Sequence, residues 1–149
     1  MFNIYFIQSG WMPISFGERK LDTVGYVGTN SREVAYLSYI DYAKDELDNL
    51  FNLKQGQEKK YEFDLEGDNL EISTKLEQDQ IKIHFEYMYS KEEEPYKFDY
   101  SFPYIDFLKN YVEEFLDNKE IYIRDFHYDE RDYNWENENW NEILTKIQN

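Results

Sequence analysis

The chain has 149 residues and a formal net charge of −16, from 32 acidic and 16 basic residues. This length suits one domain with a single hydrophobic core. The absence of cysteine excludes disulfide bonds and thiolate metal sites. The chain holds 11 Phe, 15 Tyr and 3 Trp, which excludes a disordered acidic chain, because such chains are poor in aromatic residues.

The charge is uneven along the chain. Residues 1–58 carry 8 acids and 5 bases, net −3, whereas residues 59–149 carry 24 acids and 11 bases, net −13. A folded domain with this charge repels nucleic acid and acidic membranes and attracts basic proteins. The alternative is that acidity only keeps an aromatic-rich protein soluble. No signal-peptide pattern and no membrane-spanning run is visible, so we expect a cytoplasmic protein.

The N-terminal part predicts short strands. Residues 2–8 alternate apolar and polar side chains, and residues 11–16, after a turn at Gly10, are a possible second strand. Because proline has no backbone donor, Pro13 predicts that the second strand is bent or lies at a sheet edge. Residues 24–28 are a third candidate strand. Trp11 is interpreted as a half-buried anchor rather than a binding residue.

Residues 31–53 predict a long helix. Asn30 and Glu33 have the spacing of a capping box, and Gly56 follows the expected end. Apolar side chains recur at helical spacing from Leu37 to Phe51 and would face the sheet. The acidic residues on the other side are interpreted as a solvated face. They are Asp41, Asp45, Glu46 and Asp48.

The stretch from Lys59 to Ser90 predicts a three-stranded antiparallel meander. Apolar residues alternate with polar ones in three runs, and the runs are separated by residues 66–69 and 77–80, which are rich in turn formers. Short connections require antiparallel neighbours.

Four further elements complete the expected order: a strand at 97–102, a helix at 103–117, a strand at 120–126 and a helix at about 137–147. Clustered strands indicate an α+β fold, a single domain over 1–149 with a largely antiparallel sheet packed against two to three helices.

The search for catalytic groups favours no active site. His84 is interpreted as structural, and His127 has no second histidine near it in sequence, so no metal or cofactor is predicted. No glycine-rich phosphate loop and no basic stripe for nucleic acid is present. A small hydrolase that uses carboxylates and His127 stays open as an alternative.

Acidic and aromatic residues alternate from Asp125 to Glu142, where seven acids and one arginine give a charge of −6. Aromatic residues anchor interfaces and charges steer association, so this segment is a candidate partner surface. In the alternative interpretation its aromatic rings fold into the core and its acids face water. Residues 92–94 form a weaker acidic patch. The predicted partner-binding residues are Asp125, Asp129, Glu130, Asp132, Tyr133, Trp135, Glu136 and Glu138.

A resemblance covers residues 2–90. The N-terminal strand, the residues Ser38-Tyr39-Ile40-Asp41 and 45–50, Gly56, and then Tyr61-Glu62-Phe63-Asp64-Leu65-Glu66-Gly67 resemble small acidic immunity proteins of bacterial polymorphic-toxin and contact-dependent growth inhibition systems. Such proteins often have Glu-Pro at the first hairpin, where this chain has Glu66-Gly67.

The resemblance implies a cytoplasmic, non-enzymatic inhibitor that binds a cognate toxin, often a nuclease, and covers its basic active-site surface. No nucleic acid or membrane is an expected partner. Binding positions do not carry over, because such families use different surfaces. An acidic nucleic-acid mimic that inhibits a restriction or defence enzyme is the alternative, and it predicts two rows of carboxylates at phosphate-like spacing.

Overall fold

The regular alternation of the meander builds a four-stranded antiparallel sheet. It contains β4 (Glu58–Leu65), β5 (Asp68–Glu77), β6 (Gln80–Met88) and β7 (Tyr96–Pro103), in that spatial order. Both tight turns, at Glu66-Gly67 and Gln78-Asp79, have positive φ at their two central residues, as the type I′ turn of a two-residue hairpin requires. The predicted meander and fourth strand are confirmed.

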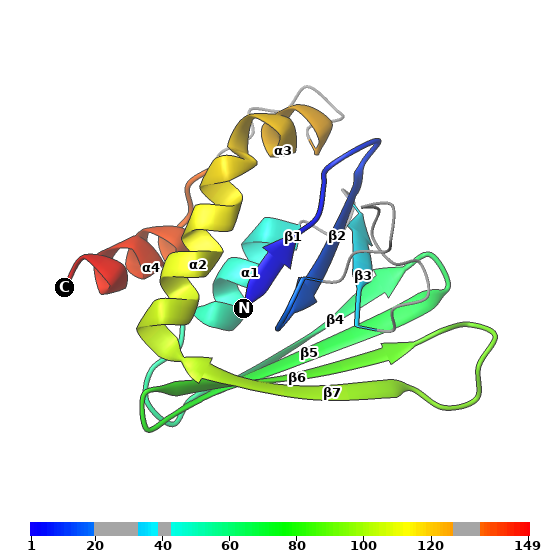
Figure 1. Cartoon of the computed structure of the whole chain (residues 1–149), viewed down its shortest axis with the longest axis horizontal. Coiled ribbons are helices and arrows are strands. Elements are labelled where there is room, and N and C mark those ends of the chain that lie inside the picture. The colour runs from blue at the N-terminus through cyan, green and yellow to red at the C-terminus, as the bar shows by residue number, and fades with distance from the viewer. Residues whose placement is uncertain (20–32, 39–42, 127–134) are drawn as a thin grey trace.

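The computed structural model describes residues 1–19, 33–38, 43–126 and 135–149. A second, three-stranded antiparallel sheet has the order β1 (Phe2–Ile4), β2 (Trp11–Phe16) and β3 (Ala35–Ser38). The helices are α1 (Ala43–Phe51), α2 (Tyr104–Asp117), α3 (Lys119–Asp125) and α4 (Glu138–Gln148). Helices and the small sheet lie above one face of the large sheet, and no helix or strand of the described residues covers the other face, which we call the open face (Figure 1). The α+β prediction is confirmed.

Pro13 lies in the central strand of the small sheet, so the predicted edge position is wrong, and the alternative of a bend at Pro13 stays a prediction. Its carbonyl accepts the Tyr5 N–H at 3.1 Å, but its ring nitrogen has no hydrogen to return. The β1–β2 ladder therefore ends at the Ile4–Ile14 pair, and β1 is shorter than the predicted 2–8. The candidate strand at 24–28 lies outside the described residues.

The predicted helix at 31–53 is wrong in its first half. Ala35–Ser38 form β3, in which Ala35 pairs with Ile14 and Leu37 with Met12. Ala35 and Leu37 are alternate residues of β3, and both are buried. Leu37 is also the first residue of the helical spacing expected up to Phe51, so the two patterns share this residue. Strand pairing with β2 outweighs the local helical pattern there. Asn30 and residues 39–42 lie outside the described residues.

The predicted strand at 120–126 is wrong, because α3 occupies it. The Tyr122 N–H donates to the Asn118 carbonyl and the Phe126 N–H to the Tyr122 carbonyl, both at 2.8 Å, as in a helix. Tyr122 is buried, whereas Ile121 is 38% exposed, which is the reverse of the predicted strand face. The predicted helices at 103–117 and 137–147 are confirmed as α2 and α4.

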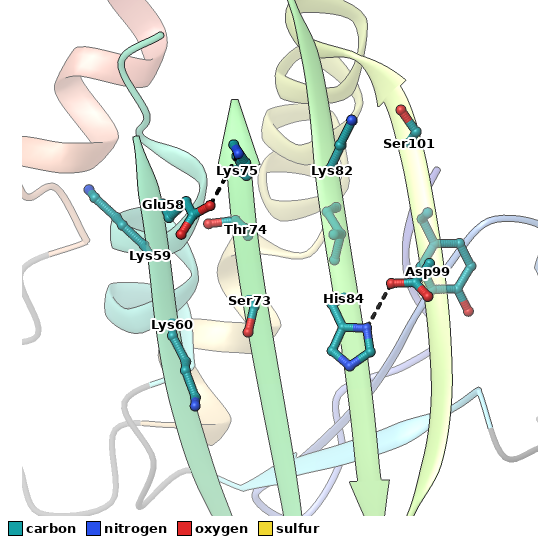
Figure 2. A pocket seen from close by; sticks show the side chains of 12 residues that line it. Glu58, Lys59, Lys60, Ser73, Thr74, Lys75, Lys82, His84, Asp99 and Ser101 are labelled. Carbon is teal, nitrogen blue, oxygen red and sulfur yellow. Dashed lines mark hydrogen bonds and ion pairs between the residues drawn. The ribbon is translucent and has the colours of Figure 1, made fainter. Parts of the chain in front are cut away.

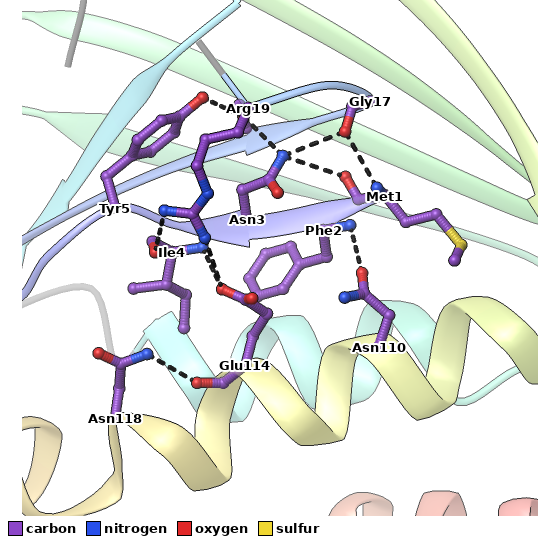
Figure 3. A network of polar contacts seen from close by, with 11 residues as sticks. Met1, Phe2, Asn3, Ile4, Tyr5, Gly17, Arg19, Asn110, Glu114 and Asn118 are labelled. Carbon is purple, nitrogen blue, oxygen red and sulfur yellow. Dashed lines mark hydrogen bonds and ion pairs between the residues drawn. The ribbon is translucent and has the colours of Figure 1, made fainter. Parts of the chain in front are cut away.

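The open edge of β1 is closed by side chains of α2 (Figure 3). The Phe2 N–H donates to Asn110 Oδ1 at 2.7 Å, and the Ile4 N–H donates to Glu114 Oε2 at 2.8 Å. Arg19 contacts the same carboxylate at 3.5 Å. These contacts satisfy backbone donors that an edge strand otherwise offers to another chain.

A buried ion pair joins α1 to the C-terminal part of the chain. Lys44 and Asp48 have fully buried side chains, with Nζ 2.7 Å from Oδ2. Lys44 Nζ also donates to the Trp135 carbonyl at 3.0 Å and lies 3.9 Å from the Trp140 ring centroid. The prediction that Asp48 belongs to a solvated face is therefore wrong.

Asp48 is held from two further elements. Its oxygens accept the Tyr111 hydroxyl at 2.6 Å and the Asn137 amide at 2.8 Å. Asn137 also caps α4, because its Oδ1 accepts the Trp140 N–H at 2.8 Å. Burial raises the pKa of Asp48 and lowers the pKa of Lys44, while their mutual contact acts in the opposite direction on both.

Replacing Asp48 by Asn is expected to lower the free energy of unfolding by about 3 kcal/mol, because it leaves the Lys44 charge buried without a counter-charge. The double variant Lys44→Met, Asp48→Leu should lose less unfolding free energy than Asp48→Asn alone, because it leaves no buried charge unpaired. Urea unfolding measures both. Glu46→Gln, on the same helix, is the matched control and should change stability by no more than about 0.5 kcal/mol. A double variant less stable than Asp48→Asn contradicts this account.

Candidate interaction surface

The open face of the large sheet carries its polar side chains in rows that cross the strands. Antiparallel register places Glu62 opposite Glu71 and Glu71 opposite Glu86, so three carboxylates lie side by side on neighbouring strands. Like charges in directly opposite positions are destabilising. Lys60 contacts Glu71 at 3.3 Å and Lys97 contacts Glu86 at 3.6 Å, which offsets part of this repulsion.

One end of the sheet concentrates acidic residues, and we call residues 62–71 and 86–97 the acidic end. This region contains the β4–β5 turn and the β6–β7 connection, which lie together at the right of Figure 1. It holds nine carboxylates and two lysines, net −7. Asp64, Glu66, Glu93 and Glu94 have no cationic partner within the described part of the chain. The weaker acidic patch predicted at 92–94 belongs to this end.

The opposite end of the sheet carries more basic than acidic residues. Residues 54–60 and 75–82 hold five lysines and three carboxylates, net +2. A shallow hollow of about 690 Å³ lies on the open face there. Lys60, Lys75 and Lys82 line it together with His84 and Ser73 (Figure 2). The open face is therefore polarised along its strands.

His84 lies between two carboxylates in the hollow. Its Nδ1 is 2.7 Å from Asp99 Oδ1 and its Nε2 is 2.9 Å from Glu86 Oε1. These two hydrogen bonds, first to Glu86 and then to Asp99, raise the pKa of His84, and the same contact lowers the pKa of Glu86. His84 is a half-buried histidine hydrogen-bonded to Glu86 on its own strand and to Asp99 on β7, and its structural role stays a prediction.

Ser73, His84 and Asp99 follow one another across three strands, an order that invites comparison with a catalytic triad. The geometry does not support nucleophilic catalysis. A triad histidine accepts the serine proton, whereas Nε2 of His84 is engaged by Glu86 and no hydrogen bond joins Ser73 to His84. With a carboxylate at each ring nitrogen, the imidazolium form is favoured over a general base.

The predicted C-terminal partner segment is described only in part. Asp125, Trp135, Glu136 and Glu138 lie within the described residues, whereas Asp129, Glu130, Asp132 and Tyr133 lie outside them, as does His127. Trp135 is 6% exposed and packs against Phe115, Tyr122 and Trp140, so its ring belongs to the core.

The acids of this segment lie further out than its aromatic rings. Glu136 and Glu138 are exposed, and Asp125 is half-buried with its carboxylate 3.2 Å from Arg124 Nε. In this segment the described aromatic rings are buried and the described glutamates face solvent. The predicted role of these acids in partner binding stays a prediction.

Comparisons with known proteins identify no relative: no protein family, curated protein or solved structure matches this chain. Among the described residues, no helix is both long enough and apolar enough to cross a membrane, and no group of three or more His, Asp or Glu side chains is placed to hold a metal ion.

The environment of His84 predicts a pH-dependent stability. Because its pKa in the folded protein is raised above 6.5, the stabilisation is fully present below that pH and is lost as pH rises through the raised value. The side chain is 31% exposed, so solvent screening limits the effect to under about 1 kcal/mol. Urea unfolding at about pH 6 and about pH 8.5 should show that His84→Gln costs more at the lower pH.

NMR titration of the His84 ring gives the matching control. Asp99→Asn and Glu86→Gln should each lower the pKa of His84, because each removes one carboxylate acceptor. Titration of wild-type His84 at or below its ordinary value would contradict the proposed cause.

Proposed function

We propose that this protein is a non-enzymatic inhibitor that binds and neutralises a basic bacterial toxin, with a nuclease as the expected class, by covering its active-site surface. The observation that carries the proposal is the acidic end of the large sheet, with nine carboxylates against two lysines. The resemblance to acidic immunity proteins supports the same class of partner.

The physical argument rests on electrostatic complementarity. A nuclease has a basic cleft that accepts phosphates, and an acidic surface that enters this cleft competes with substrate. Charged surfaces of opposite sign also accelerate association, which suits an inhibitor that must capture a toxin before it acts. In this proposal the protein acts in the cytoplasm of the cell that it protects.

Two surfaces could contact the toxin. The first is the acidic end, where Glu62 and Glu66 are exposed. The second is the predicted C-terminal segment, which has exposed carboxylates at Glu136 and Glu138. Since Trp135 is buried, the C-terminal segment offers charges rather than that aromatic anchor, and the acidic end is the better supported of the two.

The test begins with capture of a partner by the tagged protein, co-expressed with its genomic neighbours, at low and high salt. Support requires a basic protein bound in a one-to-one complex, weakened by salt, whose toxicity and enzymatic activity are abolished by this protein. A captured partner that stays active in the complex overturns the proposal.

Charge reversal then identifies the surface. Glu62→Lys, Glu66→Lys and Glu94→Lys together should slow association with the captured toxin about tenfold or more at low salt, and should make the rate less sensitive to salt. Asp129→Lys, Glu130→Lys and Asp132→Lys test the C-terminal segment in the same way. Stopped-flow or surface-based kinetics measure both.

The matched control has the same change in net charge at a different place. Glu58→Lys, Glu77→Lys and Asp106→Lys lie away from the acidic end, so association should slow much less. Equal slowing by all three triple variants would show that net charge, not a defined surface, governs binding.

A second candidate function is a nucleic-acid mimic that inhibits a restriction or defence enzyme. The row formed by Glu62, Glu71 and Glu86 favours it, because adjacent carboxylates resemble successive phosphates. A mimic needs a second row, and the next positions across β5 and β6 are Asn69 and Met88. Capture of a large DNA-processing enzyme in place of a toxin would favour the mimic.

A further inference from the structure

The strand β7 forms an edge of the large sheet. It is the last strand in the spatial order, and nothing labelled in Figure 1 lies beside its outer side. The Tyr104 N–H donates to the Asp79 carbonyl at 2.9 Å, and the backbone groups of successive residues point to opposite sides of a strand. Phe98 and Tyr100 therefore bond toward β6, and the backbone groups of Lys97, Asp99 and Ser101 point outward.

Two of the other edge strands, β1 and β4, differ from β7. The edge of β1 is closed by Asn110 and Glu114. Outward-pointing positions of β4 are Glu58, Lys60, Glu62 and Asp64, three carboxylates and one lysine, so two β4 edges repel each other. The corresponding positions of β7 are Lys97, Asp99 and Ser101, with no net charge. For the outward N–H groups of these three residues, no acceptor lies within the described part of the chain.

The sequence of β7 is complementary to itself. In Tyr96-Lys97-Phe98-Asp99-Tyr100, a charged pair of opposite sign flanks a central aromatic residue. When two copies pair antiparallel about Phe98, Lys97 of each copy lies opposite Asp99 of the other. This register forms two ion pairs and places Phe98 of one copy opposite Phe98 of the other. In both strands the charged side chains then share one face and the phenylalanines lie on the other. The side chains of Phe98 and Tyr100 are half-buried in the monomer and gain cover.

We propose that a second copy of this chain binds along β7 and joins the two large sheets into one continuous antiparallel sheet of eight strands. The charge of −16 on each copy opposes association. Salt screens this long-range repulsion but weakly affects backbone hydrogen bonds and aromatic contacts, so the dimer becomes tighter as salt rises. A complex with a basic partner is expected to weaken as salt rises. The two proposals therefore predict opposite effects of salt and are tested independently.

Sedimentation velocity on the full chain, over a wide concentration range and at low and moderate salt, tests the dimer. The mass should rise from 18.4 kDa toward twice that value with concentration. Asp99→Lys alone and Lys97→Asp alone each place like charges opposite each other and should weaken association at least about tenfold. The double variant Lys97→Asp, Asp99→Lys restores opposite charges in the same register and should restore the dimer.

Two controls separate the edge from other effects. His84→Gln removes the contact that Asp99 makes with the neighbouring strand and should leave the dimer intact. Lys82→Asp reverses a charge on the same face but away from the edge and should also leave it intact. Thermal unfolding verifies that each variant is folded. A chain that stays monomeric throughout, or a dimer that single reversals at Lys97 and Asp99 do not weaken, overturns the proposal.

Discussion

The buried pair of Lys44 and Asp48 is the interaction on which the arrangement of the helices depends. Two charges without solvent are costly unless each has further partners. Here the partners come from α2 through Tyr111, and from the chain around α4 through Asn137 and the Trp135 carbonyl. The pair therefore links α1 to α2 and to the chain at the start of α4.

The same cluster explains why Trp135 and Trp140 are buried. Trp135 and Trp140 enclose the Lys44 ammonium, with ring centroids 4.6 and 3.9 Å from Nζ. A cation held against the face of a tryptophan ring is stabilised by the ring's charge distribution. The aromatic and acidic residues of this segment, which are interleaved in sequence, therefore differ in burial where the structure describes them. The tryptophans hold the fold, and the side chains of Glu136 and Glu138 are exposed.

Sequence alone predicts the elements in which the local hydrophobic pattern agrees with the contacts that the element makes in the fold. The meander, α2 and α4 have clear periodicity and local connections, and all three are correct. The failures have a tertiary cause. Residues 35–38 pair with β2, and α3 turns Tyr122 inward to accept the Lys44 N–H at 3.0 Å, contacts that no local pattern contains. The burial of Asp48 depends on groups 63 and 89 positions away, which sequence spacing cannot reveal.

The acidic end follows from the hairpin register, which brings together carboxylates that are scattered in sequence. Glu62, Glu71 and Glu86 come from three strands, and only the pairing of β4, β5 and β6 places them in one row. Such a row costs stability, but the sheet is held by the aromatic core on its other face. Because the covered face supplies the folding energy, the open face can concentrate charge without disturbing the residues that maintain the fold.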